Sequence, residues 1–230
     1  MTRLLVHVEG ETEETFVAEL LRPYLSARGF TSVSARIVGN ARQRQNRGGI
    51  KGWDSVRKDI VSHLKQDPAC CATTMVDYYG LPRHGAGAWP GRNAAATMPF
   101  QGKAPAVEDA IAADIAASYG DSRITERFVP YVVMHEFEGL LFSDCAAFGR
   151  GIGRTDLTPA FQTIRAAFQT PEEIDDSAIT APSKRIEQLL PRYEKPLFGN
   201  LAALEIGIDA LERECPLFRR WLDRLRAVAR

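Results

Sequence analysis

The chain lacks the features that mark several common classes of protein. No apolar run approaches about 18 residues, so a membrane span is not expected. The four cysteines include no C-x-x-C pair, and we interpret them as reduced core residues of a cytoplasmic protein. Acidic and basic residues balance at 29 each, so any nucleic-acid contact would come from local basic patches.

Three well-known catalytic motifs are also missing. The sequence contains no G-x-x-x-x-G-K-[ST], which excludes a P-loop ATPase. It contains no G-x-S-x-G turn and no H-E-x-x-H helix, which argues against an α/β-hydrolase and a zincin protease. The chemistry of the chain must therefore come from residues that are brought together by the fold.

Apolar runs of strand length alternate with helical patterns in the first two thirds of the chain. This alternation predicts a parallel α/β sheet, with strands at 3–8, 33–38, 69–76 and 128–134 and helices at 13–28, 53–66 and 106–118. Beyond about residue 155 only helices are expected, around 157–168, 183–194, 200–214 and 216–229. We therefore predict an α/β domain over residues 1–150 and a helical extension over 151–230 that packs on it.

Two segments of this pattern carry unusual backbone residues. Pro23 lies inside the first helical pattern and should kink it. Residues 83–104 are rich in Gly, Pro and Ala, so we expect a long surface loop there. The last helix is amphipathic with an arginine-rich face, which favours a closing helix on the domain over a role in contacting DNA or a partner.

Acidic residues follow three of the four predicted strands. Glu9 comes after the first strand and before a Gly10 turn, Asp77 ends the third, and the pair Glu136 and Glu138 follows the fourth. The carboxyl ends of parallel strands share one edge of a sheet, where such folds place their sites. Ionised carboxylates are costly to bury, so folding alone does not explain their positions.

A divalent cation would compensate a cluster of such acids. Mg²⁺ and Mn²⁺ prefer oxygen ligands, and Glu13, one helical turn beyond Glu9, could join them. For Glu13 the alternative is that it merely suits the positive end of a helix dipole. A metal held there could support phosphoryl chemistry.

A basic segment at 40–52 contains Arg42, Arg44, Arg47 and Lys51 with three glycines and no acid. A solvated loop and a phosphate-binding loop are equally compatible with this composition. The second possibility would favour a nucleic-acid strand as the substrate.

Five blocks of the sequence, in order, resemble domain-of-unknown-function family 4276, which is grouped with Toprim-like folds. The blocks are Val8-Glu9-Gly10-Glu11-Thr12-Glu13-Glu14, Thr74-Met75-Val76-Asp77-Tyr78-Tyr79-Gly80-Leu81-Pro82, the segment 130–144, Ala181-Pro182-Ser183-Lys184-Arg185-Ile186, and Cys215-Pro216-Leu217-Phe218 with Trp221-Leu222. The first block also resembles the opening motif of OLD-type nucleases. The resemblance implies a Toprim-like α/β fold and a nuclease that acts with an ABC-type ATPase in bacterial anti-phage or mobile-element defence.

The same resemblance suggests roles for individual residues. Glu9 corresponds to the Toprim glutamate, Glu13 to the second glutamate of OLD-type sites, and Asp77 to the first acid of a D-x-D pair. Tyr79 stands where the second acid would be, so Glu136, Glu138 or Asp144 would have to supply that ligand. Lys184 resembles a basic residue that steadies the scissile phosphate, with Arg185 beside it, although an exposed lysine at a helix start is an equal alternative.

The sequence thus predicts a Mg²⁺- or Mn²⁺-dependent nuclease acting on DNA in preference to RNA. Glu9, Glu13, Asp77 and Glu138 are the expected metal ligands, with Glu136 as a ligand or an acid/base. Two alternatives remain. The chain could be a non-catalytic partner-binding subunit of an ATPase complex, which Tyr79 favours, or an enzyme that acts on nucleotides instead of polymers.

Overall fold

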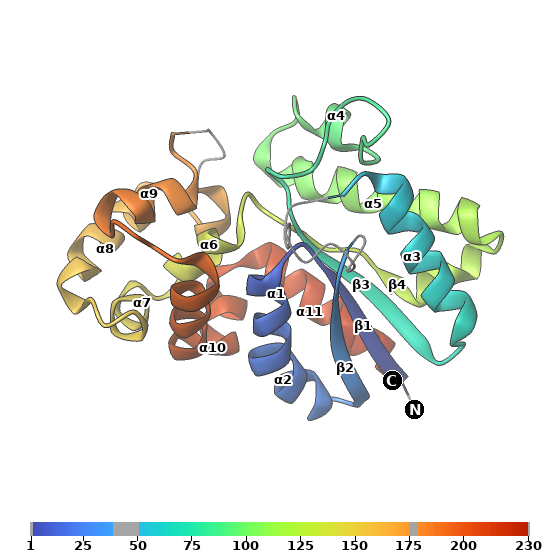
Figure 1. Cartoon of the computed structure of the whole chain (residues 1–230), viewed down its shortest axis with the longest axis horizontal. Helices are drawn as coiled ribbons and strands as arrows, with labels where there is room; N and C mark the ends of the chain where they lie inside the picture. The colour runs from blue at the N-terminus through green and yellow to red at the C-terminus, as the bar shows by residue number, and fades with distance from the viewer. Residues whose placement is uncertain (1, 39–50, 175–178, 230) are drawn as a thin grey trace.

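Strand β1 (Thr2–Val8) lies inside a parallel sheet in a computed structural model of the chain, which describes residues 2–38, 51–174 and 179–229 (Figure 1). The strand order is β2-β1-β3-β4, and β5 pairs with β3 beyond β4. Every pairing is parallel, which confirms the predicted α/β sheet. The other strands are β2 (Phe30–Ile37), β3 (Cys70–Asp77), β4 (Phe128–Val129) and β5 (Val132–Val133).

Strand β3 is buried on both faces because helices cover both sides of the sheet. Cys71 and Met75 belong to one apolar cluster, whereas Ala72 and Val76 belong to the other. This alternation follows from the two-residue period of a strand. It explains why β3 appears in the sequence as a continuous apolar run.

A nearly continuous helical segment follows β1 and covers one face of the sheet (Figure 1). It consists of α1 (Glu11–Phe16), a π-helical turn η1 (Val17–Leu21) and α2 (Arg22–Ser26). Pro23 lies at the start of α2, just after the π-helical turn, where its missing N–H is tolerated best. Gly29, with φ of +109°, lies between this segment and β2, in a backbone conformation that favours glycine.

The opposite face is covered by α3 (Trp53–Gln66) and α5 (Phe100–Tyr119). The prediction of a long loop over 83–104 was wrong at its C-terminal end, because α4 (Arg92–Ala95) and the first turns of α5 lie there. Gly102 and Pro105 have low helix propensity, so propensity alone does not predict the start of α5. Tertiary packing overrides propensity, since Ala104 and Val107 are fully buried.

The C-terminal third is helical, as predicted, and it returns to the sheet. Tyr131, which follows β4, stacks on Trp221 with ring centroids 4.4 Å apart. Trp221 Nε1 also donates a hydrogen bond to Thr73 Oγ1 of β3 at 2.8 Å. The elements here are α6 (Phe137–Leu140), η3 (Leu141–Ser143), α7 (Cys145–Gly151), η4 (Thr155–Leu157), α8 (Thr158–Ala166), η5 (Pro171–Glu173), α9 (Pro182–Leu189), η6 (Lys195–Gly199), α10 (Asn200–Glu214) and α11 (Pro216–Val228), preceded by η2 (Ser122–Glu126).

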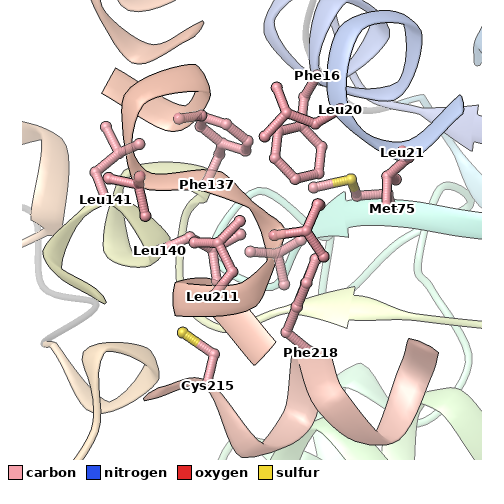
Figure 2. Packing of buried hydrophobic residues seen from close by; sticks show 14 of the residues in the cluster. Phe16, Leu20, Leu21, Met75, Phe137, Leu140, Leu141, Leu211, Cys215 and Phe218 are labelled. Carbon is pink, nitrogen blue, oxygen red and sulfur yellow. The ribbon is translucent and has the colours of Figure 1, made fainter. Parts of the chain in front are cut away.

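One apolar cluster joins the N-terminal and C-terminal parts of the chain. Figure 2 shows Phe16 of α1 close to Phe137 of α6 and Phe218 of α11, with ring centroids 5.4 Å and 6.2 Å from Phe16. All four cysteines are free and buried, as expected. Among the described residues, no helix combines the length and apolar character needed to cross a bilayer.

Candidate active site at the carboxyl edge of the sheet

The strand order reverses between the neighbouring strands β1 and β3. From β1 the chain passes to β2 through α1 and α2, and from β2 it crosses back over β1 to β3 through α3 on the other face. In doubly wound sheets, ligands bind at this reversal of strand order. Glu9 directly follows β1 and Asp77 ends β3, so these two predicted residues lie on either side of the reversal.

Two backbone N–H groups fix the relative positions of these acids. The N–H of Asp77 donates to Glu9 Oε2 at 3.3 Å. The N–H of Phe137, the first residue of α6, donates to Asp77 Oδ1 at 3.0 Å. Hydrogen bonds to backbone N–H groups offset part of the cost of placing carboxylates away from water.

Gly80 leaves room for the Glu9 carboxylate. A Cβ at position 80 would lie 3.3 Å from both Oε1 and Oε2 of Glu9, which is tighter than ordinary van der Waals contact. Any larger residue would push against the carboxylate. The glycine in the turn after β3 is therefore part of the shape of the site.

Glu13 reaches back from α1 and is buried. Its Oε2 accepts a hydrogen bond from the N–H of Gly10, the N-cap of the helix, at 2.9 Å. Its neighbour Glu14 is exposed, as a residue that serves only the helix dipole would be. Glu13 thus closes a capping box at the start of α1 and also lies beside Glu9, so its functional role stays a prediction.

Glu136 and Glu138 both belong to the same acidic cluster. Glu136 Oε2 accepts a hydrogen bond from the N–H of Ser183 in α9 at 3.1 Å. Glu138 is 1% exposed, and its Oε2 accepts from Lys195 Nζ at 3.1 Å. Its other oxygen, Oε1, is buried with no hydrogen-bond partner among the described residues.

The acids raise one another's pKa values. Burial, followed by the charges of Glu9, Glu13 and Glu138, raises the pKa of Asp77 well above its usual value. Burial and the charge of Glu9 raise the pKa of Glu13 to about 7. The pKa of Glu138 also rises to about 7, through burial and the charge of Glu136, despite the opposing effect of Lys195.

Glu9 is affected in the same direction. Burial is the largest cause of its raised pKa, and the charges of Glu136 and Glu138 add to it, against the hydrogen bond from Asp77 and the charge of Lys195. Burial would lower the pKa of Lys195, but the charges of Glu138, Glu136 and Asp77 raise it overall. Lys195 thus brings one positive charge to a cluster of five carboxyl groups.

Lys195 is a member of the cluster that the sequence analysis did not anticipate. It begins η6 and lies 57 positions from Glu138, so no local pattern connects the two. The predicted Lys184 instead pairs with Glu187 of its own helix at 2.6 Å, with both side chains well exposed. Arg185 donates to Thr180 O at 2.8 Å and lies over the Phe168 ring.

The predicted basic loop is only partly described. Arg42, Arg44 and Arg47 lie outside the described residues. Lys51 is half-buried, and its carbonyl oxygen accepts a hydrogen bond from Trp89 Nε1 at 2.9 Å. Asp144 caps α7 through the N–H groups of Ala146 and Ala147, which is a structural use of this carboxylate.

The donor set fits a hard cation in its chemistry. Carboxylate oxygens with raised pKa values gain most from an added positive charge, and the unpartnered Oε1 of Glu138 offers a buried acceptor. As the side chains stand, no three His, Cys, Asp or Glu residues in the described part of the chain are arranged to ligate one ion together. Joint binding by Glu9, Glu13, Asp77 and Glu138 would therefore need side-chain rotation.

The sheet order and this cluster define a doubly wound α/β protein with an acidic site at the reversal of strand order. Residues 8–226 match the model of the family described as Domain of unknown function (DUF4276). The chain belongs to this family. No curated protein and no solved structure matches it.

Proposed function

We propose that the chain is a Mg²⁺- or Mn²⁺-dependent nuclease with a Toprim-like site related to that of OLD-type nucleases. The observation that carries this proposal is the convergence of Glu9, Glu13, Asp77 and Glu138 at the reversal of strand order, where burial and the charges of neighbouring acids raise the pKa of each. Strongly perturbed acids that converge in a crevice are typical of functional sites. Folding alone would place fewer charges there.

Each residue of the cluster has a role in this proposal. Glu9, Glu13, Asp77 and Glu138 would hold the cation, which when bound activates water and stabilises charge at phosphorus. Lys195, held in place by Glu138, would offset the negative charge that develops on the phosphate. Glu136, fixed by the N–H of Ser183, is placed to accept a proton.

Tyr79 does not prevent this arrangement. Its side chain is exposed, whereas Glu138 interacts electrostatically with Asp77. Glu138 can therefore supply the carboxylate that is missing from the D-x-D pair. Its position on α6, well outside the turn after β3, explains why no short motif contains it.

The substrate and the partner are part of the proposal. A DNA strand fits better than a free nucleotide because the basic segment that begins before Lys51 could follow a phosphate backbone. The family resemblance adds an ABC-type ATPase as the partner and anti-phage or mobile-element defence as the context. A cytoplasmic location follows from the same proposal.

The decisive experiment combines metal binding with cleavage. Calorimetric titration with Mn²⁺ should show saturable binding to the wild type that is weakened in Glu9→Gln and Asp77→Asn. Cleavage of labelled DNA and RNA, with and without the partner ATPase, should be lost in both variants. Glu14→Gln, on the exposed side of the same helix, is the matched control and should behave as the wild type.

Two results would contradict the proposal. Cleavage that survives both substitutions would show that the cluster is not catalytic. A wild type without saturable metal binding would favour a partner-binding subunit with a degenerate site. The absence of a ready three-residue ligand set among the described residues is the observation on which that second function rests.

A further inference from the structure

Tyr79 is an exposed aromatic residue directly beside the buried acid cluster. Tyr78 before it is 1% exposed, whereas Tyr79 is 43% exposed. The two tyrosines follow Asp77 in the turn after β3, so one ring enters the core and the other meets solvent. The exposed Tyr79 ring adds nothing to the apolar core, so packing does not account for an aromatic residue at this position.

The backbone around Tyr79 is held firmly. Its N–H donates to the carbonyl of His135 at 3.0 Å, and the N–H of Tyr78 donates to the carbonyl of Val133 at 2.8 Å. The N–H of Gly80 closes the turn onto the carbonyl of Asp77 at 3.1 Å. The exposed ring is therefore carried by a rigid backbone, which lowers the entropy cost of using it for binding.

The Tyr79 side chain starts close to the Glu9 carboxylate of the proposed metal site. A Cβ on Gly80 would lie 3.3 Å from both carboxylate oxygens of Glu9. Adding one Cα–Cα step places the Cα of Tyr79 within about 9 Å of that carboxylate. Two or three stacked nucleotides of one strand cover roughly the same distance.

Basic side chains adjoin the turn that carries Tyr79. Arg92 is buried, donates to the carbonyl of Tyr78 at 3.0 Å and lies over the buried Tyr78 ring, so it holds the turn in place. Lys103 is half-buried with Nζ 5.9 Å from the centroid of the Tyr78 ring, and Arg83 is exposed four residues beyond Tyr79. Arg83 and Lys103 thus bring positive charge to the turn of the exposed ring, and proteins combine basic and aromatic side chains to bind single-stranded nucleic acid.

We propose that Tyr79 is a base-stacking residue and that the site takes an unpaired strand, so that single-stranded nucleic acid or an unpaired end is the substrate. This inference rests on the proposed nuclease function. In a duplex the faces of the bases are stacked on one another and unavailable to a side chain, whereas an unpaired base can leave the stack and lie on an aromatic ring. Tyr79 acts as a specificity residue next to the acids and takes no part in the hydrolysis.

The test measures binding without cleavage. A fluorescein-labelled 12-nucleotide single strand and the matching duplex are titrated with the full chain in EDTA, and anisotropy is recorded. Tyr79→Ala should weaken binding of the single strand about tenfold or more, while Tyr79→Phe and Tyr79→Trp retain it. Leu204→Ala, which truncates another exposed apolar side chain on α10, is the control and should change nothing.

Tyr79→Trp adds a direct signal of contact. Its fluorescence should be quenched by the single strand and not by the duplex, in a difference spectrum against the wild type. A single strand bound equally well by the wild type and Tyr79→Ala would overturn the proposal, as would a wild type that binds only the duplex or neither. Tyr79-dependent binding in EDTA, together with no cleavage in the separate Mn²⁺ assay with the partner ATPase, would support the stacking role while contradicting the nuclease function, so the two failures are distinguishable.

Discussion

The backbone N–H of Asp77 donates to the Glu9 carboxylate across 3.3 Å and so joins the ends of β1 and β3 at the carboxyl edge of the sheet. The two acids are 68 positions apart in the chain, yet this contact holds the Glu9 side chain against the backbone of Asp77. The sheet thus sets the positions of both acids, and their joint use as ligands would need only side-chain rotation.

The pH dependence of stability should reveal the acid cluster. The pKa of Glu13 is raised from its usual value near 4.5 to about 7, so the folded protein binds more protons than the unfolded chain between these values. Stability present below about pH 4.5 should therefore be lost as the pH rises through 7. Without divalent cations, the wild type should lose on the order of 2 kcal/mol more than Glu13→Gln between pH 5 and 8.

Urea denaturation at each pH measures this difference. Glu14→Gln is the matched control, because Glu14 is exposed on the same helix and should keep the wild-type slope. The comparison with Glu13→Gln cancels the opposite effect of His7, whose burial lowers its pKa to about 3. Equal slopes in the wild type and Glu13→Gln would show that Glu13 is not held in a cluster of acids.

Removal of the Lys195 ammonium group should leave the Glu138 carboxylate buried without a charged partner. In Lys195→Met the carboxylate of Glu138, 1% exposed, loses its charged hydrogen bond, and we expect a loss of about 2 kcal/mol at pH 8. The loss should shrink at pH 5, where Glu138 takes up a proton. Guanidinium denaturation at the two pH values measures both effects.

Two further variants separate this effect from a simple loss of charge. The double variant Lys195→Met with Glu138→Gln should recover much of the stability at pH 8, because no buried charge is left unpaired. Lys184→Met, which removes an exposed ion pair, should stay within about 0.5 kcal/mol of the wild type. A loss in Lys195→Met that the double variant does not relieve would argue against the pairing.

Gly80→Ala should disturb the Glu9 carboxylate with little effect on the fold. The added methyl group would lie 3.3 Å from both oxygens of Glu9, and the carboxylate would have to shift by a few tenths of an ångström. We expect at least a fivefold loss of Mn²⁺ affinity by calorimetry, with a melting temperature close to that of the wild type. Ala substitution at Gly102 of α5, where a Cβ would meet only the Met98 side chain at an ordinary van der Waals distance of 3.6 Å, is the control for an added methyl group away from Glu9.

Glu172 should be worth far more to stability than its neighbour. Its two carboxylate oxygens accept hydrogen bonds from the N–H groups of Leu217 and Phe218, both at 2.9 Å, at the start of α11. Glu172→Ala should cost about 2 kcal/mol because these buried donors lose their partner. Glu173→Ala is the control, and near-equal losses in chemical denaturation would mean that α11 does not depend on this cap.

The strands and helices could largely be predicted because their burial leaves a clear periodicity. Strand β3 is covered on both faces, so its sequence is a continuous apolar run. Helix α11 is covered on one face, so its sequence is amphipathic. The predicted fourth strand was too long, because Pro130 has no N–H to donate and divides it into β4 and β5. The start of α5 escaped prediction because packing there outweighs the low helix propensity of Gly102 and Pro105.

Only those site residues that follow the strands of the sheet could be predicted from the sequence. Glu9, Asp77 and the acids after the fourth strand come together because parallel strands end at one edge. Lys195 is brought there by the packing of η6 against α1, which is a tertiary contact without a signal in the sequence. The same holds for Ser183, whose backbone N–H, not its side chain, contacts Glu136.

The participation of Lys195 in a site that begins at Glu9 has a consequence for the synthesis of the protein. On the ribosome, β1 and the first acids emerge long before η6 does, and α11, which completes the apolar cluster, emerges after η6. The nascent chain therefore carries an incomplete acid cluster until η6 and α11 have emerged. If the cluster acts on nucleic acid as proposed, its activity would begin only after these segments have folded onto the sheet.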